Sequence, residues 1–472
     1  MKCALLSIAS VGGRRRVASA YGDWTAADDG SARPQAASNG GVLMADYIPF
    51  VNNEGDATLA RKYFDDSHCA RVPLESIERI VPALPDEMPL WVDATVDAYD
   101  CILSTAWPMD IGNEPPEAVE ALWPLDEEGA KQDDWKYEMW RRWYSLFGRF
   151  TGYRVLTDPK YWVKEYRDEL NAFVAECLDA CMKYHPVWIT VPQLPIPSGG
   201  SRNKINRMLA EAAGRWKTRT RPDAWLILPV IFTSSAILRR KPQRDDKLET
   251  VLQCYSLALA DGMWVVDMTL SDQNLSDNFL DRYSSLLAFH YGLRERLGGD
   301  APVVAGPYWG MNLVLWVRRL CRHPALGIGT SYTYYTPMSP IQKGRPKLAI
   351  PPLRRIAVAS PELQAWLEQV LADLSPDDSM YPSFKELHDQ LPLLANKDVA
   401  KDQLASSYKD WIDSITATVP NERALRLYED LSRAYVLGRR LPRMPKGVLS
   451  GDGSAGVREP GKVAEQLMLM SL

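Results

Sequence analysis

Two aspartates interrupt apolar runs in closely similar settings. Asp93 ends the segment Leu-Trp-Val-Asp and Asp267 ends Trp-Val-Val-Asp, while a third carboxylate, Glu54, follows an apolar run in Val-Asn-Asn-Glu-Gly. Carboxylate pairs whose pKa values are tuned apart carry out general acid/base chemistry, or glycosyl transfer at separations of about 5 to 9.5 Å. These three residues are therefore candidate catalytic groups of a hydrolase or transferase. Because aspartate at a strand end also opens loops and caps helices, a structural role stays open for each.

A glycine-rich turn precedes a basic helical segment near residue 200. Two glycines ahead of a helix N-terminus, followed by basic side chains, can bind an anion through backbone N–H groups, the helix dipole and direct charge. This turn predicts a phosphate or carboxylate subsite formed by Gly199, Gly200, Ser201, Arg202 and Lys204. The pattern GxxxxGK[ST] is missing, so the turn is not a P-loop. A flexible loop ahead of a solvated basic helix would explain the same residues.

Other polar and aromatic residues follow predicted strands. Amides there can hydrogen-bond a substrate, and aromatic rings can stack on a flat organic ligand. We expect substrate-binding roles for Gln193, Tyr308, Trp309, Asn312 and Tyr332.

The sequence gives less support to a zinc site or a serine nucleophile than to carboxylate chemistry. None of the five histidines ends a predicted strand, which argues against a histidine-ligated zinc site. The serine nucleophile pattern GxSxG is absent. No cofactor is predicted; magnesium held by Asp93, Asp267 or Glu54 together with waters is the alternative.

The elements that must position these residues alternate between strand and helix. Short, mostly continuous apolar runs separate segments with helical spacing, which is typical of parallel βαβ units covered on both sides. Eight strands are expected, at residues 47–51, 90–95, 187–191, 225–232, 263–268, 303–306, 326–331 and 348–350. The pattern predicts an α/β fold, a (βα)8 barrel of the triosephosphate-isomerase type, whose active site lies at the carboxyl ends of the strands. An open doubly wound parallel sheet is the alternative, but no strand is followed by GxGxxG.

The chain organises into four predicted regions. Residues 1–43 lack apolar periodicity and are expected to be disordered or a non-native extension, with Met44 a candidate start. Residues 44–358 form the barrel, with a large helical insertion at 96–184 after the second strand. Residues 359–445 form a helical subdomain that begins with a Ser360 cap and Pro361, and 446–472 a flexible tail.

Composition narrows the class of protein. Hydrophobic residues at 46% and charged residues at 24% are typical of globular chains, and no apolar run is long enough to cross a bilayer, so no membrane partner is expected. The odd number of cysteines, without CxxC spacing, indicates reduced thiols and a cytoplasmic location. The net charge of −5 provides no global attraction to nucleic acid, so such binding would need local basic patches. The three candidate basic patches are formed by Arg239, Arg240, Lys241 and Arg244; by Arg318, Arg319 and Arg322; and by Arg439, Arg440 and Arg443.

Two functions remain open from the sequence. The first is an enzyme acting on a small phosphorylated or otherwise anionic substrate, such as a nucleotide or sugar derivative. The second is a non-catalytic barrel that serves as a scaffold for protein or nucleic acid. Carboxylate placement separates them, because an enzyme requires Asp93 and Asp267 to face one pocket. Oligomeric state and reaction are left undetermined by the sequence.

Overall fold

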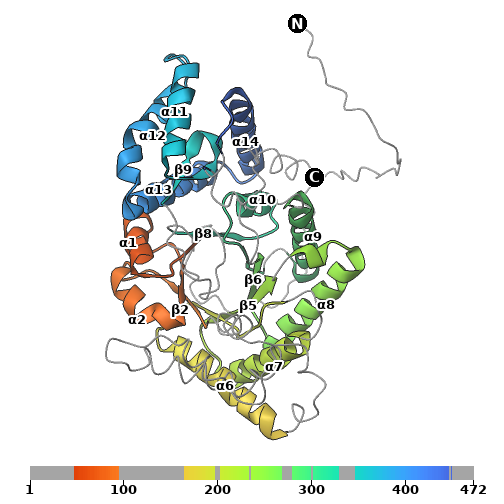
Figure 1. Ribbon diagram of the computed structural model, residues 1–472. Coiled ribbons are helices and arrows are strands. Elements are labelled where there is room, and N and C mark those ends of the chain that lie inside the picture. Colours follow the sequence, from red (N-terminus) through yellow and green to blue (C-terminus); the bar gives the residue numbers. More distant parts are fainter. Residues whose placement is uncertain are drawn as a thin grey trace, which may run out of the picture. The chain divides into compact units, whose positions relative to one another are not determined.

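A closed barrel of eight parallel strands forms the centre of the computed structural model (Figure 1). The ring closes because β1 pairs with β8, with Ile48 opposite Ala325 and Phe50 opposite Gly327. The predicted (βα)8 barrel is thereby confirmed, and the open doubly wound sheet is wrong. The strands are β1 (Ile48–Phe50), β2 (Ala70–Pro73), β3 (Leu90–Asp93), β4 (Trp188–Thr190), β5 (Trp225–Phe232), β6 (Gly262–Asp267), β7 (Val303–Ala305) and β8 (His323–Gly327).

The structure describes residues 47–94, 164–196, 202–232, 235–267, 279–298, 301–328, 346–445 and 448. The chain divides into two compact units, Met1–Val42 and Leu43–Leu472, and all the described residues belong to the second. The predicted tail apart from residue 448, most of the predicted insertion and the residues before 47 lie outside them.

Two strand predictions were wrong. The expected eighth strand at 348–350 is part of β9 (Lys347–Ile350), which pairs antiparallel with β10 (Arg355–Val358) in a separate sheet. The second barrel strand, β2, was missed because Arg71 and Pro73 break its apolar run. The long connection therefore follows the third strand rather than the second, and Asp93 and Asp267 end the third and sixth strands.

Helices surround the strands as the βα alternation predicts (Figure 1). Asn53 caps the first of them, since its side chain accepts the Asp56 N–H at 3.0 Å. The described helices before residue 330 are α1 (Glu54–Tyr63), α2 (Ile77–Ile80), α6 (Lys164–Met182), α7 (Arg202–Thr220), α8 (Lys241–Ala258), α9 (Phe279–Leu297) and α10 (Met311–Val317). None of the helices in the described ranges combines the length and apolar character that crossing a membrane requires.

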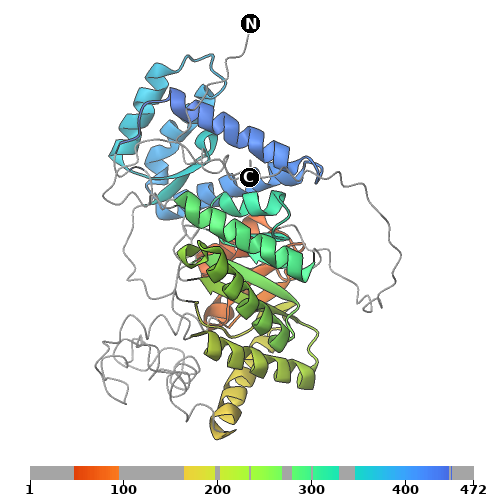
Figure 2. The ribbon, with the colours of Figure 1, turned by 90° about the vertical axis from the view of Figure 1, so that its right-hand side faces the viewer.

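The C-terminal region contributes four more helices, seen together in blue in Figure 2. They are α11 (Pro361–Asp373), α12 (Tyr381–Leu394), α13 (Lys397–Thr416) and α14 (Arg423–Arg440). The predicted Ser360 cap is confirmed, because its hydroxyl accepts the Leu363 N–H. Buried side chains of α11 and α12 share a second core with β9.

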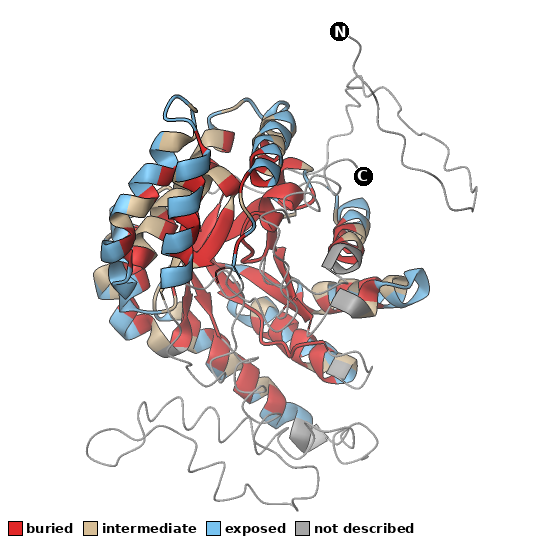
Figure 3. Ribbon diagram, turned by 45° about the horizontal axis from the view of Figure 1, so that its top comes forward, coloured by how far each residue is buried: buried red, intermediate tan, exposed pale blue. Residues whose placement is uncertain are grey.

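The last two helices belong to the barrel's own core. Tyr408 and Trp411 of α13 and Leu431 of α14 pack in the same buried cluster as the strands, and α13 lies against α1 while α14 lies against α10. Figure 3 shows buried residues running from the strands into the inner faces of these helices. The C-terminal region therefore completes the barrel's outer layer.

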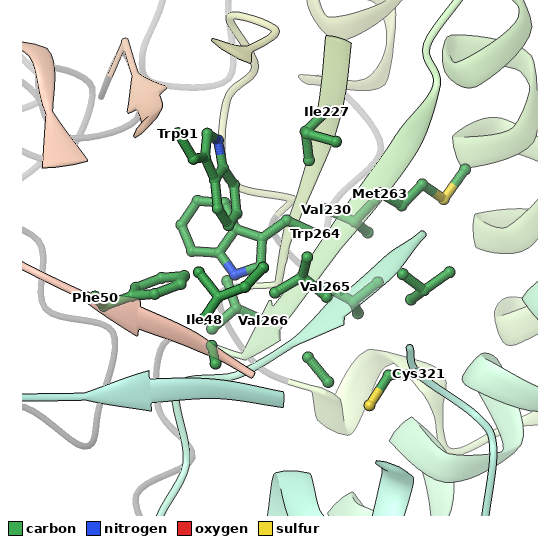
Figure 4. Close-up of a cluster of buried hydrophobic side chains, with 14 of the residues drawn as sticks. Ile48, Phe50, Trp91, Ile227, Val230, Met263, Trp264, Val265, Val266 and Cys321 are labelled. Carbon is green, nitrogen blue, oxygen red and sulfur yellow. The ribbon is translucent and has the colours of Figure 1, made fainter. Parts of the chain in front are cut away.

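Aromatic side chains fill the barrel interior (Figure 4). The rings of Phe50, Trp91 and Trp264 meet edge to face, with centroids 5.4 to 5.5 Å apart. The Trp91 indole N–H donates to the Thr190 hydroxyl at 2.9 Å, and that of Trp264 to the Gly306 carbonyl at 2.7 Å. The interior is thus a packed core, and any site must lie at its rim.

Candidate functional site

A buried ion pair occupies the rim above the aromatic core. Asp93 ends β3 with 1% of its surface exposed, and Arg71, on β2, is 3% exposed. The Arg71 guanidinium donates through Nη2 to Asp93 Oδ2 and through Nη1 to Asn52 Oδ1, the latter at 2.8 Å. Asn52 lies two residues after the end of β1, so three adjacent strands and their ends build one polar cluster.

The guanidinium also covers the aromatic core. Its central carbon lies 5.2 Å from the Phe50 ring centroid and 5.6 Å from that of Trp264. Cation–π attraction to these rings stabilises the positive charge, and Asp93 compensates it. Arg71 was missed by the sequence analysis, because nothing marked its segment as a barrel strand.

The carboxylate of Asp56 supports this cluster through Asn52. Its Oδ2 accepts the Asn52 backbone N–H and the Asn53 side-chain amide, both at 3.1 Å. Burial raises the pKa of Asp56 to about 6, although these hydrogen bonds and the charge of Lys401 oppose the increase. Asp56 thus holds Asn52, which in turn holds Arg71.

The predicted residue Glu54 lies two positions earlier and is exposed at the start of α1. Its catalytic role stays a prediction. The sequence signal for Asp56 was its place three residues after an N-cap asparagine, where an acidic side chain can reach back to the N–H groups that precede the helix.

Asp267 is fully buried at the end of β6. Its backbone N–H donates to the hydroxyl of Tyr308 at 2.6 Å, and the Tyr308 ring packs edge-on against Tyr283 with centroids 6.0 Å apart. The structure therefore confirms that Asp93 and Asp267 both end barrel strands. In the closed ring, β3 and β6 are separated by only two strands.

The predicted ligand contacts after β7 are engaged with the C-terminal region. Trp309 stacks on Tyr408 of α13, with centroids 4.6 Å apart, and its indole N–H donates to the Arg354 carbonyl at 2.9 Å. Asn312 donates to the Ala325 carbonyl, and its Oδ1 accepts from the Tyr408 hydroxyl at 2.7 Å. Ligand roles for Tyr308, Trp309 and Asn312 stay predictions. Tyr408 was missed because an aromatic residue on a helical stripe carries no sign of what its hydroxyl binds.

Gln193 joins the segment after β4 to α7. Its amide donates to the carbonyls of Pro192 and Asn206, at 2.9 and 3.0 Å, and Asn206 in turn binds both backbone groups of Leu194. Gln193 is 4% exposed. Its predicted substrate contact is untested.

The anion-binding turn is described only in part. The predicted helix does begin at Arg202, although nothing is described of the Arg202 side chain, and Lys204 is exposed in its first turn. Gly199, Gly200, Ser201 and Tyr332 lie outside the described residues. The anion subsite therefore stays a prediction.

Other reactive groups are held inert by burial. Burial lowers the pKa of His290 to about 4 and raises that of Cys254 to about 12. The pKa of Cys181 is also raised, first by burial and further by the charge of Asp93. In the described part of the chain, no three His, Cys, Asp or Glu side chains form a group able to hold a metal. Magnesium thus stays a prediction in which water or substrate supplies the remaining ligands.

No protein-family model matches this chain, and the curated proteins contain no significant match to it. We therefore infer function from the residues and their geometry alone.

Proposed function

We propose that this barrel is an enzyme, a hydrolase or transferase, that acts on a phosphorylated or otherwise anionic organic substrate at the carboxyl ends of its strands. Asp93 and Asp267 supply the acid/base or nucleophilic groups. Arg71 orients Asp93, and the predicted anion subsite at the start of α7 binds the substrate's anionic group. Nucleotides and sugar derivatives are the substrate classes that this chemistry fits.

The buried Arg71–Asp93 pair carries the proposal. Taking two charges out of water costs several kcal/mol each, and apolar residues of similar volume often stabilise such a position equally well or better. A charged pair held by further hydrogen bonds at a barrel rim is therefore better explained by use than by packing. Barrels of this type place their active sites at this rim.

The two carboxylates suit different roles. The Asp93 carboxylate has a guanidinium partner, whereas the main chain of Asp267 is fixed by a tyrosine hydroxyl. Different surroundings allow one carboxyl group to act as base or nucleophile while the other acts as acid.

A thermal-shift screen of the full chain tests the proposal. The panel contains phosphorylated sugars and nucleotides, each with and without magnesium. A ligand present at 100 times its Kd should stabilise the wild type by about 2.7 kcal/mol. We expect Asp267→Asn to abolish that stabilisation. Asp223→Asn, which alters an exposed aspartate just before β5 at the opposite end of the barrel, should retain it.

The ion pair needs its own variant, because Asp93→Asn alone would leave Arg71 buried opposite a neutral group. The double variant Arg71→Met/Asp93→Leu removes both charges together and should fold without responding to ligand. If Asp267→Asn and the double variant Arg71→Met/Asp93→Leu are stabilised by ligand as much as the wild type is, the proposal is refuted. The absence of any response, together with salt-sensitive binding of nucleic acid or of a protein partner, would favour the scaffold function instead.

A further inference from the structure

A cavity of about 620 Å³ lies in the C-terminal region, and one of its lining residues, Arg354, also accepts the indole N–H of Trp309 through its carbonyl. The short turn Pro351–Leu353, the residues that begin α12 and one side of α14 enclose it. None of the predicted site residues lines it. Its volume falls within the range of small-molecule sites.

Two ion pairs form the fixed part of its wall. Arg354 binds Asp430 of α14 through Nε and Nη2, each at 2.8 Å, and both side chains are less than a fifth exposed. Arg440 binds Asp378 at 3.1 Å. The Met380 N–H and the Arg440 charge lower the pKa of Asp378, so that this carboxylate stays charged. Each of these aspartates therefore neutralises one arginine.

Arg433 is a third cation on the same wall. Its nearest carboxylate in the described part of the chain is Glu429, at 3.8 Å, which is beyond hydrogen-bond distance. Its side chain is 69% exposed. The residues that line the cavity thus include three arginines and two aspartates, and the third arginine, Arg433, has only the longer ion pair with Glu429 in the described part of the chain. A guanidinium in this position can donate two parallel hydrogen bonds to a carboxylate, sulfonate or phosphate.

The rest of the lining is largely apolar. Met380 and Leu437 contribute to it, and so does Val436, which is 58% exposed although it is aliphatic. An exposed aliphatic side chain beside a cavity gains free energy when a ligand covers it. The cavity therefore combines an apolar surface with one arginine that makes no hydrogen bond to a carboxylate in the described part of the chain.

We propose that this cavity binds a small organic anion, whose acidic group pairs with Arg433 and whose apolar body lies against Met380, Val436 and Leu437. None of Asp93, Asp267 and Arg71 lines this cavity, so the inference does not depend on whether the barrel is an enzyme.

The test uses two fluorescent probes of nearly equal shape on the full chain. 1-Anilinonaphthalene-8-sulfonate carries an anionic group, whereas N-phenyl-1-naphthylamine is neutral. Loss of one charge-assisted hydrogen bond at an exposed position should weaken binding of the sulfonate about fivefold in Arg433→Gln. Binding of the neutral probe should be unchanged. Val436→Trp, which fills the cavity, should weaken binding of both probes.

Arg439→Gln is the matched control. Arg439 lies on the same helix and is exposed, but it does not line the cavity, so this variant should bind the sulfonate as the wild type does. Equal sulfonate binding by Arg433→Gln and Arg439→Gln would overturn the proposal, and so would unchanged binding in Val436→Trp. Asp267→Asn should keep full sulfonate binding, which separates failure of this site from failure of the proposed function. Melting temperatures establish that every variant is folded.

Discussion

Replacing Asp56 with asparagine is expected to remove a pH dependence of stability between about pH 4 and pH 6. Asp56 is 2% exposed, and burial raises its pKa from 3.8 to about 6. The folded protein therefore holds this proton more tightly than the unfolded chain does. The contribution of Asp56 to stability is fully present below pH 3.8, and it is lost as the pH rises through about 6.

The size of the effect follows from the pKa shift. A shift of about two units corresponds to about 3 kcal/mol, which the wild type has lost by pH 7. Asparagine does not titrate, and its carbonyl can still accept the N–H groups of Asn52 and Asn53. Any packing change caused by the substitution adds an offset that is constant with pH. The expected signature is therefore the pH dependence of the free energy of unfolding. Relative to Asp56→Asn, the free energy of unfolding of the wild type falls by up to about 3 kcal/mol from pH 3.5 to pH 7, and it falls no further above pH 7.

Urea unfolding followed by tryptophan fluorescence, from pH 3.5 to pH 8, measures this difference. The control is Asp66→Asn, which alters an exposed aspartate just after α1 and should leave the slope of the wild type unchanged. A difference between wild type and Asp56→Asn that stays constant over this range would refute the reasoning. A wild type that gains stability relative to Asp56→Asn as the pH rises would reverse the sign of the effect and refute the reasoning as well.

Three further variants probe how the barrel is held together, each by urea unfolding. Tyr408→Phe should cost about 1 to 3 kcal/mol, since it leaves the buried Gly310 N–H without its hydroxyl partner; a neutral effect would contradict this. Gly214→Ala should cost about 1 to 3 kcal/mol or more, because the added Cβ would lie 2.0 Å from the Leu257 carbonyl oxygen and force α7 away from α8. Asp93→Leu alone should cost about 3 to 5 kcal/mol, and adding Arg71→Met should recover most of that loss; an additive loss would show that the two charges are not coupled.

The apolar strands were predictable because of where they lie. Parallel strands inside a ring of helices are covered on both faces, so Trp225–Phe232 and Gly262–Asp267 show as continuous apolar runs. β2 failed this criterion because of Arg71, whose guanidinium lies above the interior rings. Arg71 thus gives the rim its buried positive charge, and it is also the reason that β2 was not predicted. Because β2 was not predicted, residues 348–350 were wrongly taken as the eighth strand of the barrel.

The site was predictable only where residues end strands. Asp93 and Asp267 stood out as charges that close apolar runs, and the structure confirms that placement. Their partners are distant in sequence: Arg71 lies on a neighbouring strand, and Tyr408 lies in a helix near the far end of the chain. Hydrophobic periodicity gives the type of an element and its buried face, but not which polar atoms meet across the core. Such pairings come from tertiary structure alone.

The two carboxylates have different direct partners. Asp93 is fixed by Arg71 and Asn52, on the strands beside it. The Asp267 backbone is fixed by the Tyr308 hydroxyl, and the Tyr308 carbonyl lies 2.9 Å from the Tyr408 hydroxyl of α13, which shares its one proton between this oxygen and Asn312 Oδ1. α13 reaches both sides of the proposed site, because Tyr408 contacts Tyr308 and the charge of Lys401 acts on Asp56, which holds Asn52 beside Arg71. If the barrel is the proposed enzyme, its acid/base pair needs two carboxyl groups in different surroundings, and the different partners of Asp93 and Asp267 meet that requirement. The proposed function would then give a reason for α13 to share the barrel's core.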